Sequence, residues 1–276
     1  MDVQSTKKPI IGAQLYSLRD FCRTLDDTAR TLDRVREMGY SVVQLSSVRP
    51  MDDDPVGLAR VLRDSGVGAC CTHVSLDSIL ADPAREIARH EEWGVRHVAI
   101  GSCPTRYPLT LAGVRDLAKD FAKAAESLAA AGMDLSYHNH RFEFVHVEDG
   151  RTFLRAFYDS LPPSVLKAEL DVAWVAAGGA SPATLIRSLG RRQPLMHLKD
   201  YVLAQTHPED PERRNETFDC PVAVGSGNLD WPDIIAAAVE AGVEYALVEL
   251  DSARGGDPFA EMAKSRKFLL SLGCLN

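Results

Sequence analysis

The chain has 276 residues, a formal net charge of -8 and a pI near 5.5. This acidic balance argues against nucleic acid as a partner, because phosphate binding needs a basic face, and apolar runs of only strand length argue against a membrane partner. Six scattered cysteines, none in a CxxC pair, and a first stretch without the apolar run of a secretory leader indicate a reduced, cytoplasmic protein with free thiols.

Short β-rich runs alternate with amphipathic stretches along the chain. We expect strands at 10–16, 41–45, 67–74, 95–100, 133–138, 165–171, 194–198 and 245–250. We expect helices at 26–38, 55–64, 83–93, 111–131, 150–160, 182–189, 231–241 and 258–272. The helix at 111–131 has the clearest pattern, because Leu117, Phe121 and Leu128 fall on one face and Gly132 follows as a stop signal. The alternation predicts parallel strands joined by right-handed crossovers.

Eight such units favour a single (β/α)8 TIM barrel over residues 1–276. The alternative, an open doubly wound sheet, would normally carry a GxGxxG fingerprint after its first strand, where this chain has LYSLRD. The segment 201–221 is the long irregular stretch. We expect it to close over the site when substrate is bound, with Arg213 and Arg214 available to an anionic or polyhydroxylated substrate.

Acids and imidazoles collect where the predicted strands end. They are Thr72 and His73, residues 137–143, Glu169 and Asp171, His197 with Lys199 and Asp200, and Glu249 with Asp251. The C-terminal strand ends of such a barrel meet at one mouth, and buried groups of this kind are costly unless they are paired or bind a cation. Mixed carboxylate and imidazole ligands suit Mn²⁺, Mg²⁺, Co²⁺ or Zn²⁺. The pattern therefore predicts one divalent metal ion.

Several of these residues also have a simpler interpretation. His73 could be an ordinary hydrogen-bonded histidine, Asp171 could cap the next helix, and Lys199 and Asp200 could form a solvated ion pair. Trp174 is interpreted as a packing residue. Three other histidines are expected at the surface: His90, His146 and His207.

Taken together, the segments resemble the sugar phosphate isomerase/epimerase family, also called the xylose isomerase-like barrel. The resembling segments are GAQLYSLRD (12–20), YHNHRFEF (137–144), ELDVAWVAAGG (169–179), MHLKDY (196–201), VGSGNLDWPDII (224–235) and YALVELD (245–251). The resemblance implies a metal-dependent isomerase or epimerase that acts through an enediolate on a ketose or keto-sugar derivative. Mn²⁺ is the ion that we expect it to use.

The resemblance also implies a ligand set. By position, Asp171, His197 and Glu249 match three metal ligands of the family. Ketose 3-epimerases of the family carry a fourth ligand, a glutamate, at the end of strand 5, where this chain has Tyr137. We assign the fourth place to Glu143, and leave His138 or His140 as the alternative.

The candidate catalytic residues follow from the same segments. We expect His138 or His140 to be the general acid or base, because histidine titrates nearest neutral pH. Glu143, Glu249 and Lys199 are the further candidates.

Other functions stay open. Because this chain has Tyr137 where the 3-epimerases have a glutamate, a metal-dependent dehydratase or lyase that acts on a keto-sugar or an inosose is an alternative. A non-catalytic sugar-binding barrel and a DNA repair endonuclease of the same superfamily are further alternatives. The acids and the histidine at strands 6 to 8 oppose the first of these, and the net charge opposes the second. The expected partner is a small sugar, and the sequence leaves a homo-oligomer open.

Overall fold

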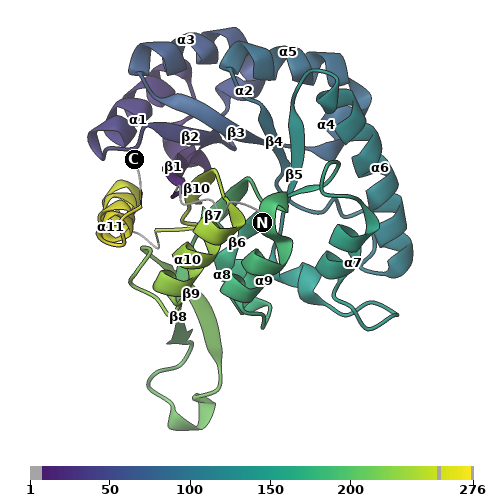
Figure 1. The fold of residues 1–276 in the computed structure, drawn as a ribbon. Helices are drawn as coiled ribbons and strands as arrows, with labels where there is room; N and C mark the ends of the chain where they lie inside the picture. Colours follow the sequence, from purple (N-terminus) through teal and green to yellow (C-terminus); the bar gives the residue numbers. More distant parts are fainter. Residues whose placement is uncertain (1–7, 254–255, 275–276) are drawn as a thin grey trace.

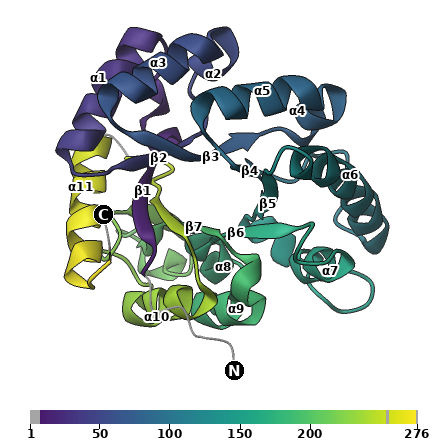
Figure 2. The same ribbon diagram turned by 45° about the horizontal axis from the view of Figure 1, so that its top comes forward.

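Eight parallel strands close into a barrel in the computed structural model, which describes residues 8–253 and 256–274 (Figures 1 and 2). The strands are β1 (Ile10–Gln14), β2 (Val42–Leu45), β3 (Gly68–Val74), β4 (His97–Ile100), β5 (Asp134–His138), β6 (Lys167–Asp171), β7 (Leu195–Leu198) and β10 (Tyr245–Val248). Each strand pairs with the next barrel strand, and β1 pairs with β10, with Ile10 opposite Tyr245, to complete the ring. The predicted TIM barrel is confirmed.

An outer ring of helices covers the barrel (Figure 2). Its members are α1 (Leu25–Glu37), α3 (Pro55–Ser65), α5 (Pro83–Trp93), α6 (Leu111–Ala129), α7 (Phe153–Ser160), α9 (Pro182–Leu189), α10 (Trp231–Ala241) and α11 (Pro258–Ser271). Several begin with a side-chain cap and a proline in the first turn, as Asp54 with Pro55 and Asp82 with Pro83 do. These residues satisfy free N–H groups and fix the first φ angle, so the boundaries agree with the prediction.

Short elements that the sequence did not reveal lie between the strands and the outer helices. They are η1 (Leu15–Phe21), α2 (Pro50–Asp53), α4 (Leu76–Ala81), η2 (Arg141–Phe144), α8 (Val172–Ala177) and η3 (Gly190–Arg192). They are too short to show a hydrophobic period. Most of them follow the C-terminal end of a strand, so they shape the barrel mouth.

The segment expected to be irregular is instead mostly a β-hairpin. Strands β8 (Asp200–Gln205) and β9 (Thr217–Val222) pair antiparallel, and a short 3-10 turn η4 (Pro211–Arg213) lies in the loop between them. The hairpin extends away from the barrel body (Figure 1). Its register joins Asp200 to Val222 and Gln205 to Thr217, so the prolines fall mainly in the connecting loop and only Pro221 lies inside a strand.

Apolar packing fills the space between the barrel and its helices. One buried cluster includes Leu32, Leu58 and Met262, and a second includes Phe121, Phe157 and Leu166. Within the described ranges no helix has the length and apolar character needed to cross a bilayer. Buried polar groups gather at the mouth of the barrel, and a second set that includes Glu86, Arg89 and His90 is buried at α5.

Candidate active site

A layer of buried polar side chains crosses the barrel at the C-terminal ends of its strands. Its members come from seven of them: Gln14, Gln44, His73, His138, Glu169, Asp171, His197 and Glu249. All are buried except His73, which is half-buried. Acids and imidazoles in such a place cost free energy unless they pair or bind a cation. The layer therefore marks the functional end of the barrel.

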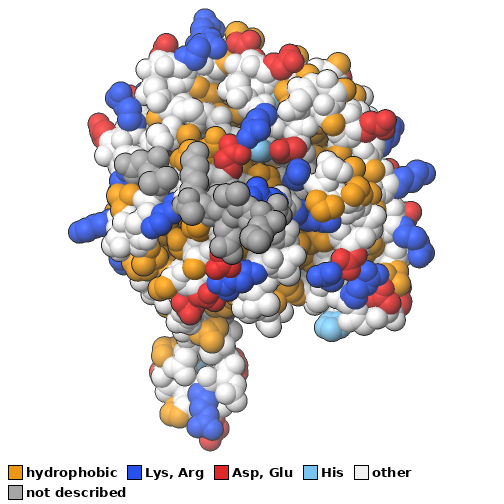
Figure 3. Space-filling model, in the orientation of Figure 1, with side chains coloured by type: hydrophobic (Ala, Val, Ile, Leu, Met, Phe, Trp, Pro, Cys, Tyr) orange, Lys and Arg blue, Asp and Glu red, His pale blue; other side chains and the backbone are white. Residues whose placement is uncertain are grey.

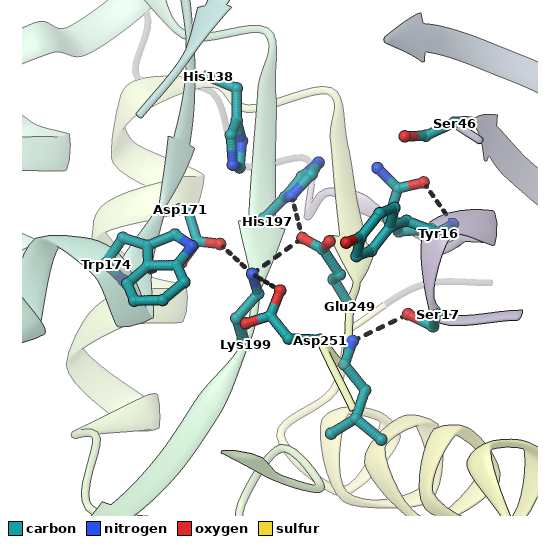
Figure 4. Close-up of polar contacts among 12 residues, drawn as sticks. Tyr16, Ser17, Ser46, His138, Asp171, Trp174, His197, Lys199, Glu249 and Asp251 are labelled. Carbon is teal, nitrogen blue, oxygen red and sulfur yellow. Dashed lines mark hydrogen bonds and ion pairs between the residues drawn. The ribbon is translucent and has the colours of Figure 1, made fainter. Parts of the chain in front are cut away.

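His197 lies at the centre of this layer (Figure 4). Its Nδ1 is 2.7 Å from Glu249 Oε2. Its Nε2 is 2.6 Å from Gln44 Oε1 and 3.3 Å from Glu169 Oε1. Burial favours the neutral ring, but the charges of Glu169 and Glu249 outweigh burial and raise the pKa of His197 to about 10. The surrounding carboxylates thus attract positive charge to this point.

Lys199 holds three carboxylates together beside His197 (Figure 4). Its Nζ lies 2.8 Å from Asp251 Oδ1, 3.1 Å from Asp171 Oδ2 and 3.2 Å from Glu249 Oε2. Burial opposes the ammonium charge, yet the three acids prevail and raise the pKa of Lys199. The half-buried Trp174 ring lies 5.1 Å from the same nitrogen, in keeping with a packing role.

The solvated pair expected for Lys199 and Asp200 is wrong, because both side chains are buried and point to different partners. Asp200 Oδ2 accepts hydrogen bonds from the backbone N–H groups of Gly225 and Gly227, each at 3.0 Å, and from Trp231 Nε1 at 2.7 Å. Asp200 therefore anchors the chain that returns from the hairpin, while Lys199 belongs to the site.

Glu169 connects the layer to the opposite wall of the barrel. Its Oε2 is 2.6 Å from His73 Nε2, and its Oε1 accepts a hydrogen bond from Gln44 Nε2 at 2.8 Å. Burial raises the pKa of Glu169, but the charges of His197 and His73 outweigh it and hold the pKa below its usual range. His73 is hydrogen-bonded, as its simpler interpretation predicted. The sequence placed Glu169 among the acids at the strand ends but gave it no role, and it did not single out Gln44, because the partners of both residues lie on distant strands.

The same side chains form two overlapping groups that could hold a metal ion. Their ligand atoms lie within 4.8 Å of one another in the sets His73, His138, Glu169, His197 and His138, Asp171, His197, Glu249. His138 belongs to both sets, and its Nδ1 is buried without a hydrogen-bond partner. Three carboxylates contact the single lysine here and a fourth contacts His197, so the acids outnumber the lysine. An unpaired ring nitrogen and a surplus of acid fit a divalent cation.

Glu143 lies apart from these ligand sets. Its Oε1 accepts a hydrogen bond from Tyr137 Oη at 2.7 Å, and its Oε2 accepts one from the His140 backbone N–H at 2.8 Å. Burial outweighs both bonds and raises the pKa of Glu143 to about 7. Because its oxygens are engaged in fixing the turn after β5, the geometry favours His138 over Glu143 as the fourth ligand.

A cavity of about 550 Å³ opens above the polar layer. His138, His140, Lys199 and Glu249 line its inner side, and residues 74–77 and 100–105 line the opposite wall. His140 Nδ1 is buried without a hydrogen-bond partner. Burial and then the Lys199 charge lower the pKa of His140 to about 4, which favours the neutral ring. Three histidines, a lysine and three carboxylates thus line the same space.

Some of the remaining sequence interpretations agree with the structure and others do not. Asp171 Oδ1 accepts a hydrogen bond from Trp174 N at 2.9 Å, so Asp171 caps α8 as well as facing Lys199. His146 is exposed as expected, but His90 is buried and not at the surface. Its ring bonds Thr72 Oγ1 at 2.7 Å and the Glu86 carbonyl at 2.6 Å, which a helical sequence alone does not reveal.

Comparisons with known proteins agree with this architecture. A family model described as the xylose isomerase-like TIM barrel matches residues 32–272. A comparison with curated proteins finds no match.

Three similar solved structures cover nearly the whole chain. A sugar phosphate isomerase/epimerase from Parabacteroides distasonis is 21% identical, with 98% of each chain covered and a TM-score of 0.78. A xylose isomerase-like TIM barrel protein from Mycobacterium smegmatis, in complex with magnesium, is 17% identical, with 96% of each chain covered and a TM-score of 0.71. An L-ribulose 3-epimerase is 18% identical, with 96% of this chain and 94% of that chain covered and a TM-score of 0.68. At these identities the likeness shows the fold.

Proposed function

This chain belongs to the xylose isomerase-like TIM barrel family, and we propose that it is a divalent-metal-dependent sugar isomerase or epimerase acting on a ketose or keto-sugar derivative. The observation that carries the proposal is the buried meeting of His138, Asp171, His197 and Glu249 beneath a cavity lined by His140 and Lys199. The neighbours described as sugar isomerases and epimerases support the same reaction class.

The proposed metal ligands are His138, Asp171, His197 and Glu249. They offer two imidazole nitrogens and two carboxylates, a set that suits Mn²⁺ and also accepts Mg²⁺, Co²⁺ or Zn²⁺. The magnesium complex of the mycobacterial neighbour is consistent with a divalent ion. When bound, such an ion polarises a sugar carbonyl and the adjacent hydroxyl.

The proposed base is His140. Its ring lines the cavity and its lowered pKa keeps the ring neutral, so a ring nitrogen that faces the cavity can take a proton from the carbon next to the carbonyl. The Lys199 ammonium, which also lines the cavity, favours negative charge on a substrate oxygen. Proton removal gives an enediolate, and return of the proton to another atom or face completes isomerisation or epimerisation. Glu249 is the second group that can carry that proton.

The second candidate is a dehydratase or lyase on a keto-sugar or an inosose. It is favoured by Tyr137, which occupies the position of the strand-5 glutamate of the family's 3-epimerases and whose hydroxyl donates to Glu143. The 3-epimerase mechanism, in which two glutamates exchange protons on opposite faces of the substrate, then lacks one of its two glutamates. An elimination needs only a single base. Both reactions begin with the same proton removal, so identifying the products is what distinguishes them.

The test is solvent deuterium exchange at the carbon next to the carbonyl, with Mn²⁺ and a panel of ketoses, keto-glycosides and inososes. We expect His140→Ala to lose exchange by at least about 100-fold, as loss of a general base does, while elemental analysis still finds one metal per chain. His146→Ala is the matched control, because His146 is exposed on the loop after η2. Exchange at the wild-type rate in His140→Ala would rule out His140 as the base.

A further inference from the structure

The charge around the cavity limits the substrates that it can accept. We infer that the substrate is an uncharged polyhydroxy carbonyl compound, a free sugar or a glycoside, without a phosphate or carboxylate group. This inference rests on the proposed function and names the substrate class of the same site.

Lys199 is the single lysine or arginine that lines the cavity within residues 8–253 and 256–274. It is 3% exposed and lies within 3.2 Å of oxygens of Asp171, Glu249 and Asp251. Its ammonium charge is therefore already compensated by three carboxylates of the site. An anionic substituent would find no lysine or arginine on the cavity lining that is free to pair with it.

Cations near the rim are engaged within the protein. The Arg19 guanidinium donates to the Tyr16 carbonyl at 2.6 Å and to the Asp251 carbonyl at 3.3 Å. Arg106, next in sequence to the wall of the cavity, pairs with Asp77 Oδ1 at 2.5 Å and donates to Tyr107 Oη at 2.6 Å. Neither guanidinium lines the cavity.

The wall opposite the metal ligands offers hydroxyl groups and a further acid. Ser75, Ser102 and Thr105 line it, and Asp77 lines it beside them. At the N-terminus of α4, Ser75 Oγ accepts a hydrogen bond from Ser78 N at 3.0 Å, so one of the N–H groups there is already engaged. Hydroxyls and carboxylates recognise sugar hydroxyls, whereas buried phosphate needs arginine, lysine or unpaired N–H groups.

The arginines of the hairpin do not add positive charge to the cavity in this structure. Arg213 pairs with Glu216, with Nε 2.8 Å from Oε1, in the loop between β8 and β9. That loop extends away from the barrel body, and neither Arg213 nor Arg214 lines the cavity (Figure 1). The expectation that these arginines meet an anionic or polyhydroxylated substrate therefore applies only to a closed hairpin and stays a prediction.

The inference is tested with matched pairs, each a ketose and its terminal phosphate ester, in the deuterium exchange assay with Mn²⁺. We expect kcat/KM for the uncharged member to exceed that for the ester by at least about 100-fold, as when a buried charge is left unpaired. Equal or faster exchange of the esters overturns the inference and leaves the proposed function standing. Exchange with no member of any pair contradicts the proposed function itself, and the substrate class with it.

A variant that adds a positive charge to the cavity tests whether missing positive charge is the reason that the ester is rejected. Ser102→Arg places a guanidinium on the hydroxyl wall, and we expect it to raise exchange of the phosphate ester at least about tenfold relative to wild type. Ser188→Arg, on the exposed side of α9, adds the same charge elsewhere and should change neither substrate. If Ser102→Arg rejects the ester as strongly as wild type does, missing positive charge is not the reason.

Arg254 lies outside the described residues and is tested in the same assay. We expect Arg254→Ala to leave the preference for uncharged sugars unchanged. If wild type instead exchanges the esters and Arg254→Ala loses that activity alone, Arg254 supplies a phosphate site and the inference is overturned.

Discussion

The neighbours of Gln44 determine which way its side-chain amide is turned. Tyr16 N donates to Gln14 Oε1 at 3.1 Å, so Gln14 Nε2 must be the atom that donates to Gln44 Oε1 at 2.6 Å. The other end of Gln44 then donates to Glu169, and its Oε1 accepts the proton on His197 Nε2. With Nε2 engaged in this way, Nδ1 of His197 faces Glu249 and is the nitrogen available to a metal.

Replacing Gln44 should therefore weaken metal binding. We expect Gln44→Leu to lower metal affinity by about 10- to 100-fold, the range seen when groups that orient a ligand are lost, and Asp171→Ala to abolish stoichiometric binding. Chelator competition measures both. Gln193→Leu is the control, because Gln193 is also buried but precedes β7, at the strand end away from His197. Wild-type affinity in Gln44→Leu would show that the amide does not orient His197.

Glu143 should make stability depend on pH. Burial raises its pKa from 4.5 to about 7, so the native state holds this proton more tightly than the unfolded state does. The contribution to stability is therefore full below pH 4.5 and is lost as pH rises toward 7, by about 3 kcal/mol in total. Urea unfolding at pH 5 and pH 8 should show Glu143→Gln gaining stability relative to wild type at the higher pH. A constant difference between the two proteins would contradict this assignment.

At the scale of elements, the hairpin is attached next to the site. Tyr201, Asp219 and Pro221 at its base share a small pocket with Trp174 and Lys199. Asp200 fixes the returning chain through two backbone N–H groups and an indole. A movement of the hairpin would thus reach Lys199 directly.

Closure over bound substrate is a prediction for this element. We expect trypsin cleavage after Arg213 and Arg214, in the loop between β8 and β9, to slow when a saturating substrate is present. A sugar that shows no deuterium exchange serves as the control ligand and should give no protection. The same cleavage rate with and without substrate would show that the hairpin does not close.

Long elements were predictable and short ones were not. Helices such as α6 carry an apolar stripe over several turns, which identifies them without tertiary information. The hairpin was missed because its prolines suggested an irregular loop. In the site, Asp171, His197 and Glu249 follow apolar strands and stand out, whereas Gln44 has meaning only through Glu169, 125 residues away.

At the scale of the whole molecule, charge is mixed and not segregated. On the face shown in Figure 3, basic and acidic side chains are interspersed, and the chain has a net charge of -8. Nucleic acid binding needs a continuous basic surface. We therefore expect no cleavage of abasic-site DNA under conditions where sugar exchange is active. Metal-dependent cleavage that Asp171→Ala abolishes would instead support the endonuclease alternative.

The polar layer has a consequence for recombining the barrel. The half from β1 to β4 carries Gln14, Gln44 and His73, and the half from β5 to β10 carries Glu169 and His197. Glu169 finds its hydrogen-bond partners at His73 and Gln44, across that division. If one half of the barrel were replaced by that of a relative, the new half would have to supply matching hydrogen-bond partners. Otherwise the buried carboxylate of Glu169 would be left without them. Successful chimaeras should be those in which the glutamine of β2 and the histidine of β3 are inherited together with the acid of β6.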